Sequence, residues 1–148
     1  MHLPYIRKLF WEKPITLVPL MVGHVPPEKM DDFAKALAPY FMDPKTLFVV
    51  SSDFCHWGKR FKFTHTFSEE PLIYKSISKL DHMGMELIEK QNLKGFQDYL
   101  NEYKNTICGR NPICVLLATI EYCEKNKAGA KFETKFIKYA QSSEIHSD

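Results

Sequence analysis

A continuous apolar run that leads directly into polar side chains constrains the fold of this chain most strongly. The run reads LFVV at residues 47–50, and SSDFCHWG follows it at residues 51–58. Such a run predicts a strand that is buried on both faces, as in a parallel sheet. Open α/β sheets bind their ligands just beyond the carboxyl ends of their strands. Asp53 and His56 can therefore enter one crevice, or Asp53 can cap the turn while His56 satisfies a backbone carbonyl.

Two further segments, residues 15–23 and 130–142, also have the composition of strands. Helical periodicity covers four other segments, at residues 27–43, 69–91, 94–104 and 113–125. A strand, a helix and a strand in this order favour a right-handed unit with parallel strands. The sequence therefore predicts an α/β fold in which a mostly parallel sheet, formed by residues 15–23, 47–52 and 130–142, is flanked by helices.

The bulk composition is that of one globular domain without an unusual partner. The chain has 148 residues, of which 45% are hydrophobic, and its formal net charge is +2. This near-balance gives no electrostatic reason to expect nucleic acid, and no apolar stretch is long enough to cross a membrane. No CxxC pair occurs among the four cysteines, which are Cys55, Cys108, Cys114 and Cys123. We therefore expect reduced thiols and a cytoplasmic location.

A second group of chemically active residues surrounds Cys108. A helix is expected to begin just beyond it, with Asn111 as the N-cap and Arg110 beside the thiol. This setting favours a thiolate. A thiolate can bind a metal together with Asp53 and His56, or it can act as a nucleophile with His56 as base. The structural alternative is that Cys108 is an inert, buried residue.

A basic and aromatic stretch follows Gly58. It interleaves cations with phenylalanines, namely Lys59, Arg60, Phe61, Lys62, Phe63 and Phe67. The cations can contact a phosphate. The alternative is an irregular loop in which the aromatic rings pack and the cations remain solvated.

Five segments of the sequence resemble the Memo family, named for a mediator of ErbB2-driven cell motility. They are MHLPY at residue 1, LFVVSSDFCHWG at 47, LDHMGM at 80, NTICGR at 105 and YAQSS at 139. The resemblance implies a fold like that of LigB-type class III extradiol dioxygenases, with a vestigial rather than an active enzyme site. It also implies a signalling or interaction protein that links phosphotyrosine on a receptor or adaptor to the cytoskeleton and cell motility. The alternative that it implies is an iron- or copper-binding redox protein.

The resemblance also suggests roles for individual residues. Cys108 matches the family's metal-ligand cysteine, Asp53 and His56 match pocket residues, and Arg110 is a further pocket candidate. Two histidine ligands of the family lie in an N-terminal half that we do not find in this sequence. We therefore expect residues 1–148 to be the C-terminal portion of one Memo-like domain, with an incomplete ligand set. We further expect exposed apolar surface around residues 1–11, through which copies can associate.

Overall fold

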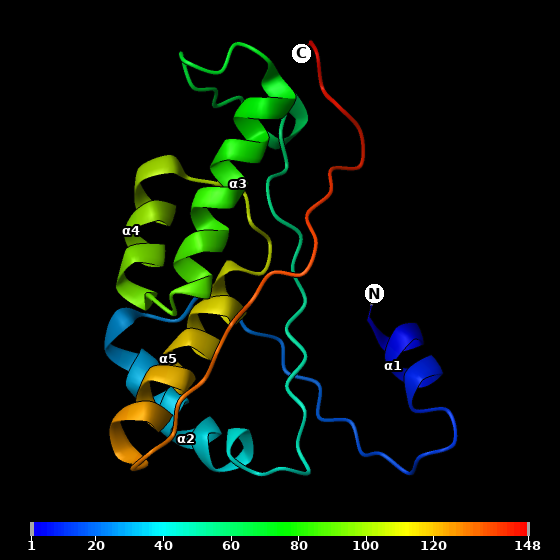
Figure 1. Cartoon of the computed structure of the whole chain (residues 1–148), viewed down its shortest axis with the longest axis vertical. Helices are drawn as coiled ribbons and strands as arrows, with labels where there is room; N and C mark the ends of the chain where they lie inside the picture. Colours follow the sequence, from blue (N-terminus) through cyan, green and yellow to red (C-terminus); the bar gives the residue numbers. More distant parts are fainter. Residues whose placement is uncertain (1, 148) are drawn as a thin grey trace.

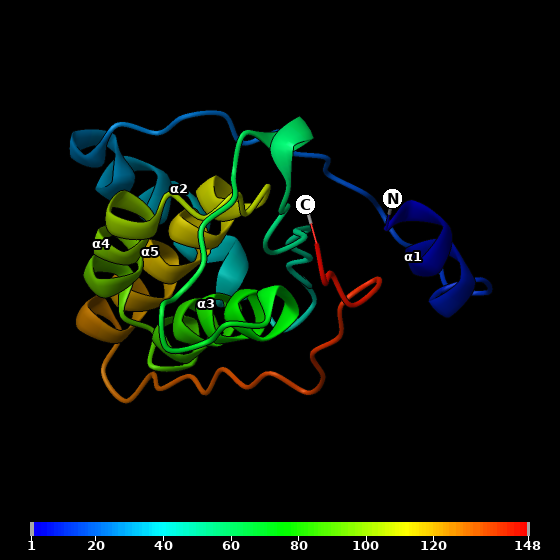
Figure 2. The ribbon, with the colours of Figure 1, turned by 90° about the horizontal axis from the view of Figure 1, so that it is seen from above.

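A computed structural model describes residues 2–147, and within this range the regular secondary structure is almost entirely helical (Figure 1). The helices are, in chain order, α1 (Leu3–Leu9), η1 (Pro27–Lys29), α2 (Met30–Phe41), η2 (Lys59–Phe61), α3 (Ile73–Glu89), α4 (Leu93–Tyr103) and α5 (Arg110–Asn126). Helices α2 to α5 gather into one bundle, and long irregular segments run beside it (Figures 1 and 2). Across residues 2–147, no helix combines the length and the apolar composition that a membrane crossing requires.

The pairing of α2 with α5 is the largest helix contact of the bundle. The face of α2 that it buries carries Met30, Ala34 and Ala38, which are spaced four residues apart along one side of the helix. The two alanines let the helix axes approach closely. Pro27 starts the helical segment, and Asp31 and Asp32 place negative charge in the first turn of α2, where the helix dipole favours it.

Helices α3 and α4 form a hairpin with a glycine at their contact. A Cβ added at Gly84 would lie 3.0 Å from the Tyr99 ring, so this glycine permits the close approach of the two helices. The Tyr99 hydroxyl donates to the Leu80 carbonyl at 2.8 Å and satisfies its own polar group in the core. The Asn92 side chain caps α4 by accepting from the Gly95 amide at 2.8 Å. Removing such a cap costs about 1 kcal/mol.

The hydrophobic core lies where α3, α4 and α5 meet. Its largest fully buried side chains include Phe96, Leu80, Ile107 and Leu117. Burial of each such side chain contributes about 1.5–3 kcal/mol relative to full exposure. Ile107 belongs to the loop between α4 and α5, so the loop that carries Cys108 is fixed to the core by its neighbour.

The predicted parallel sheet is wrong for the described residues. In residues 2–147 only an isolated bridge between Gly58 and Phe63 has β-type pairing, and residues 15–23, 47–52 and 130–142 are irregular. A strand requires a neighbouring backbone, and these segments find other partners or none. The Gln91 side chain donates to the Phe132 carbonyl at 2.8 Å, and the Phe136 amide donates to the Glu89 carboxylate at 2.7 Å. Along residues 130–142, side chains thus make hydrogen bonds to the backbone where a neighbouring strand would make them in a sheet.

The predicted helices are confirmed, with shifted ends. The segment expected at residues 69–91 becomes helical only at Ile73, and α5 begins at Arg110, earlier than expected. Gly109 is the N-cap of α5. The expected N-cap Asn111 is therefore wrong, because this residue already lies inside the helix.

Helix α1 stands apart from the bundle in both views (Figures 1 and 2). It buries none of its residues, and Leu9 and Trp11 are 77% and 63% exposed. The Arg7 guanidinium lies 4.5 Å from the centre of the Trp11 ring, which is a contact within the segment itself. The expected apolar exposure is thus found for residues 2–11, while Met1 lies outside the described residues. The sequence did not predict the helix.

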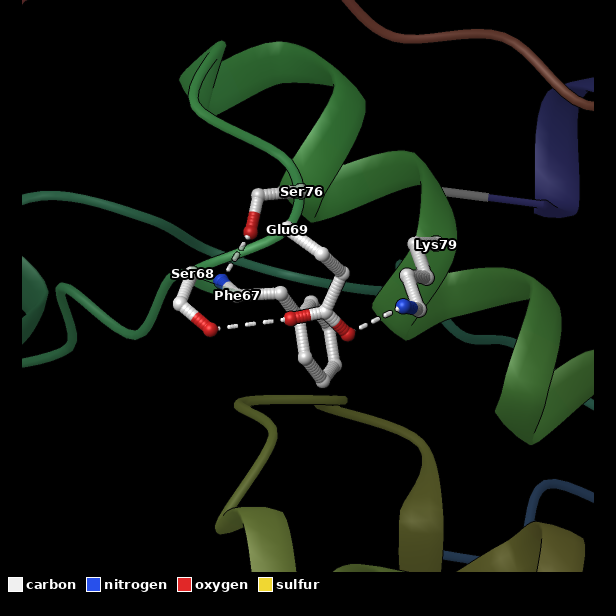
Figure 3. A network of polar contacts seen from close by, with 5 residues as sticks. All are labelled: Phe67, Ser68, Glu69, Ser76 and Lys79. Carbon is white, nitrogen blue, oxygen red and sulfur yellow. Dashed lines mark hydrogen bonds and ion pairs between the residues drawn. The ribbon is translucent and has the colours of Figure 1, made fainter.

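The segment before α3 is held to that helix by a small polar network (Figure 3). The Phe67 amide donates to Ser76 Oγ at 2.6 Å, and Lys79 Nζ lies 2.6 Å from Glu69 Oε1 and 4.7 Å from the centre of the Phe67 ring. Because the ion pair is exposed, water and salt screen it, and it adds little to the stability of the fold. The network returns the chain to α3 after the basic turn described below.

Candidate functional site

The structure brings Asp53, His56 and Cys108 together. One ligand atom from each residue lies within 4.8 Å of the corresponding atoms of the other two. Asp53 and Cys108 are exposed, and His56 is half-buried. The convergence that the sequence predicts therefore occurs without the sheet on which the prediction was based. Two loops, residues 52–56 and 105–109, supply the three side chains.

Reciprocal hydrogen bonds join the two loops at Asp53 and Cys108. The Cys108 amide donates to the Asp53 carbonyl at 3.2 Å, and the Asp53 amide donates to Cys108 Sγ at 3.1 Å. An N–H group that points at sulfur stabilises negative charge on it. The backbone of one loop thus orients the thiol of the other.

A second pair of bonds fixes His56. Its amide donates to Thr106 Oγ1 at 2.7 Å, and the Thr106 hydroxyl donates to the His56 carbonyl at 2.8 Å. One threonine side chain therefore satisfies both backbone groups of the candidate ligand. The imidazole remains available, because these bonds use only the backbone.

A glycine makes the closest approach of the two loops possible. The Gly109 amide donates to Ser52 Oγ at 3.0 Å. A Cβ at this position would lie 2.3 Å from the Ser52 Cβ and 2.6 Å from the Ser51 carbonyl oxygen. Because a separation under 3 Å is a clash, only glycine fits between the loops as they stand.

A basic turn lies beside His56. We define it as residues 58–63, which close through a 2.7 Å bond from the Gly58 amide to the Phe63 carbonyl. The Phe61 ring lies 5.2 Å from the His56 ring, and the Arg60 guanidinium lies 4.4 Å from the centre of the Phe61 ring. The alternative of packed rings and solvated cations describes the turn only in part, because Phe63 is buried while Phe61 stays partly exposed.

Arg110 begins α5 and is exposed. Its guanidinium donates to the Ile107 carbonyl at 3.0 Å, which holds it on the loop that also carries Cys108. The described contacts of Arg110 do not include Asp53 or His56. It is therefore a cation near the crevice rather than a member of the cluster.

A buried acid lies beneath the two loops. Asp81 of α3 is 3% exposed and accepts from the Cys55 amide and from Asn105 Nδ2, each at 3.1 Å. Burial raises the pKa of Asp81 above its ordinary value, and the hydrogen bonds oppose this shift. Burial, followed by the charge of Asp81, raises the pKa of the neighbouring Cys55 thiol to about 12. Cys55 is therefore a protonated thiol at neutral pH, and it does not belong to the group formed by Asp53, His56 and Cys108.

The donor set fits a metal ion. A carboxylate, an imidazole and a thiolate are the donors that transition metals use in proteins. Donors bound at about 2.0–2.3 Å to one ion can be at most about 4.6 Å apart, so the separation of 4.8 Å needs only a small adjustment. Among the cysteines of the described residues Cys108 is the exposed one, whereas Cys114 and Cys123 are buried and Cys55 is half-buried.

The sequence missed the residues that assemble the crevice, namely Thr106, Gly109, Asp81 and Asn105. Two of the segments that resemble the Memo family contain them, LDHMGM and NTICGR. A lone acid on the apolar face of a predicted helix, such as Asp81, is the signal that could have identified one of them.

Comparison with known proteins gives a consistent result over the whole chain. A family described as "Memo-like protein" matches residues 1–148. Among curated proteins, Protein MEMO1 of Xenopus laevis and of Homo sapiens are each 45% identical over 149 aligned residues, which cover 99% of this chain and 50% of theirs. Protein memo-1 homolog of Caenorhabditis elegans is 40% identical, over 99% of this chain and 42% of its own. The chain thus spans about half the length of the curated relatives it matches.

Proposed function

This chain belongs to the Memo family, and we propose that it acts in signalling, as an interaction protein that links receptor phosphotyrosine to the cytoskeleton and cell motility. The crevice of Asp53, His56 and Cys108, with the basic turn at its side, receives the phosphotyrosine side chain in this proposal.

The contacts of Arg60 with the Phe61 ring and of the Phe61 ring with the His56 ring carry the proposal. These contacts hold a guanidinium close to the crevice, and a second cation, Arg110, begins α5 directly after the opposite loop. A phosphate monoester carries a charge of about −1.5 to −2 at neutral pH and offers three acceptor oxygens. Arginine matches these oxygens with paired donors, which makes it the preferred residue for such recognition.

The Asp53 carboxylate limits where the phosphate can lie. Like charges repel strongly in a partly desolvated crevice, so the phosphate is expected at the basic turn while the tyrosine ring enters beside Phe61. A cation held between Asp53 and Cys108 would remove this repulsion. Phosphate recognition and metal binding are thus compatible at one site.

The test uses N-acetyl-phosphotyrosine amide and its unphosphorylated form as probes, with binding measured by calorimetry. We expect a preference for the phosphorylated probe that Arg60→Gln reduces about tenfold or more, because a hydrogen bond to a charged group contributes about 1.5–3 kcal/mol. Lys35→Gln replaces an exposed cation of α2 and serves as the matched control. Equal binding of the two probes by the unaltered chain, or equal effects of the two variants, would contradict the proposal.

A second function, the binding of iron or copper, is favoured by the donor cluster. Asp53, His56 and Cys108 would hold the ion, whose chemistry would be one-electron redox exchange. Thr106 fixes the backbone of His56, and the Asp53 amide donates to Cys108 Sγ, so that this chain's own groups set the position of two donors.

Metal content after reconstitution tests the second function directly. We expect bound iron or copper, and we expect Cys108→Ser and Asp53→Asn each to lower the affinity about tenfold or more. His24→Gln alters an exposed histidine outside the cluster and should leave the affinity unchanged. Retention of the metal by both ligand variants would exclude the cluster as the site.

A further inference from the structure

We propose that Asp81 is a positioning residue of the crevice, which holds the loops of residues 52–56 and 105–109 in register on α3. The proposal rests on the proposed function only in taking Asp53, His56 and Cys108 as the working groups. Asp81 itself has no described contact with any of the three.

The contacts of Asp81 reach three separate segments. Its Oδ1 accepts from the amide of Cys55, which lies between Asp53 and His56, and from the side-chain amide of Asn105. Its Oδ2 accepts from the Tyr139 hydroxyl at 2.9 Å. One carboxyl oxygen therefore binds both loops of the crevice, while the other binds the irregular segment that passes along α3.

The side-chain orientation of Asn105 leaves one of its own polar atoms without a partner, which indicates that the bond to Asp81 determines this orientation. Its side-chain amide donates to Asp81 at 3.1 Å and to the Tyr99 hydroxyl at 2.7 Å. Its Oδ1 atom is buried and has no partner among the described residues. An unpaired buried polar atom is destabilising, because it loses its hydrogen bonds to water without gaining a protein partner. The structure retains this orientation because the opposite one would leave Asp81 without its donor.

Asp81 joins the loops of the crevice to helix α3. The bonds of Thr106 to His56 and of Cys108 to Asp53 join one loop to the other. Asp81 instead belongs to α3, which packs on α4 beside the fully buried Leu80. Removal of the carboxyl would leave the two loops bound to each other and detached from this helix at two points.

The experiment compares Asp81→Ala, Asp81→Asn and Thr119→Val in the full chain. Asparagine can still accept from Cys55 and Asn105 through its carbonyl oxygen, so it serves as the conservative rescue. Thr119 is a fully buried residue of α5, whose hydroxyl donates to the Val115 carbonyl, and its variant controls for the loss of a buried polar group elsewhere. Amide hydrogen exchange of both loops and cobalt(II) affinity are measured, the latter by the thiolate charge-transfer absorption.

We expect Asp81→Ala to accelerate exchange at the Cys55 and Cys108 amides at least tenfold, relative to the amides of α5. We expect it to lower cobalt affinity about tenfold to a hundredfold, as the loss of outer partners of a metal ligand typically does. Asp81→Asn should keep the exchange rates of the loop amides and the cobalt affinity close to those of the unaltered chain. Thr119→Val should not accelerate exchange in the two loops relative to α5, and it should leave the cobalt affinity unchanged. Unchanged loop exchange in Asp81→Ala, or an effect of Thr119→Val equal to it, would overturn the inference.

Two results separate this inference from the proposed function. Absence of cobalt binding by the unaltered chain, with selective loop exchange in Asp81→Ala, would refute metal binding and support the positioning role. If Asp81→Ala does not fold, Asn105→Ser removes only one arm of the anchor. Asn105→Ser should then accelerate hydrogen exchange of the Cys108 amide but not of the Cys55 amide. An equal acceleration at the two amides would overturn the inference.

Discussion

Substitution of Gly109 by alanine should separate the two loops of the crevice. The added Cβ would lie 2.3 Å from the Ser52 Cβ, whereas non-bonded carbon atoms pack at about 3.5–4.0 Å. The loops must therefore move apart by about 1.2 Å or more. Gly109 has φ −89°, which alanine adopts without strain, so backbone strain adds nothing to the cost.

The magnitude follows from two contributions. Overpacking of this kind costs about 1–3 kcal/mol. The bond from the Gly109 amide to Ser52 Oγ is lost as well, for about 0.5–1.5 kcal/mol. We therefore expect a loss of about 1.5–4.5 kcal/mol in the free energy of unfolding. The cluster would also open beyond the span that one metal ion can bridge, so cobalt(II) binding should be lost.

Urea unfolding and cobalt titration measure the two effects. Gly23→Ala is the matched control, because a Cβ at Gly23 meets nothing within 4 Å. Its effect on stability should be within about 0.5 kcal/mol. If Gly109→Ala and Gly23→Ala have the same urea midpoint and the same cobalt affinity, the close approach of the loops does not determine the site.

Three further outcomes are expected. Burial raises the pKa of Asp81, so above about pH 4 the native state keeps a proton that the unfolded state has lost. The free energy of unfolding should therefore fall as pH rises above about 4, and Asp81→Asn should flatten this pH dependence in urea titrations. Gly84→Ala should destabilise the chain by about 1 kcal/mol in urea, despite the better helix propensity of alanine, because its Cβ meets the Tyr99 ring at 3.0 Å. The exposed Leu9 and Trp11 should cause concentration-dependent association in sedimentation velocity, and a monodisperse monomer would contradict this.

The sequence predicted helices α2 to α5 because their apolar periodicity coincides with the contacts that they make, whereas α1 buries none of its residues and was not predicted. Gly84 fits the same relation, since glycine inside a periodic helix signals a close neighbour. The sheet was wrong because an apolar run reports that a segment tends to be extended or buried, but not which backbone it pairs with. Residues 130–142 show this, with Gln91 and Glu89 side chains bonded where a neighbouring strand was expected.

The candidate site was predictable at its three reactive residues and not at their supports. Asp53, His56 and Cys108 have side chains with few inert uses at junctions between elements, so their chemistry was visible in the sequence. Gly109 and Asp81 act through contacts between residues far apart in the chain. The lone acid at position 81 on the apolar face of a helix could have marked Asp81 as unusual, but only the folded structure shows which distant residues Asp81 and Gly109 contact.

X-ray absorption fine structure of the copper- or iron-loaded chain tests most directly whether Asp53, His56 and Cys108 act as one site. We predict one sulfur at about 2.3 Å, together with nitrogen or oxygen ligands at about 2.0–2.2 Å, and loss of the sulfur contribution in Cys108→Ser. A coordination shell without sulfur in the unaltered chain, or one that Cys108→Ser leaves unchanged, would contradict the assignment of this crevice as the functional site.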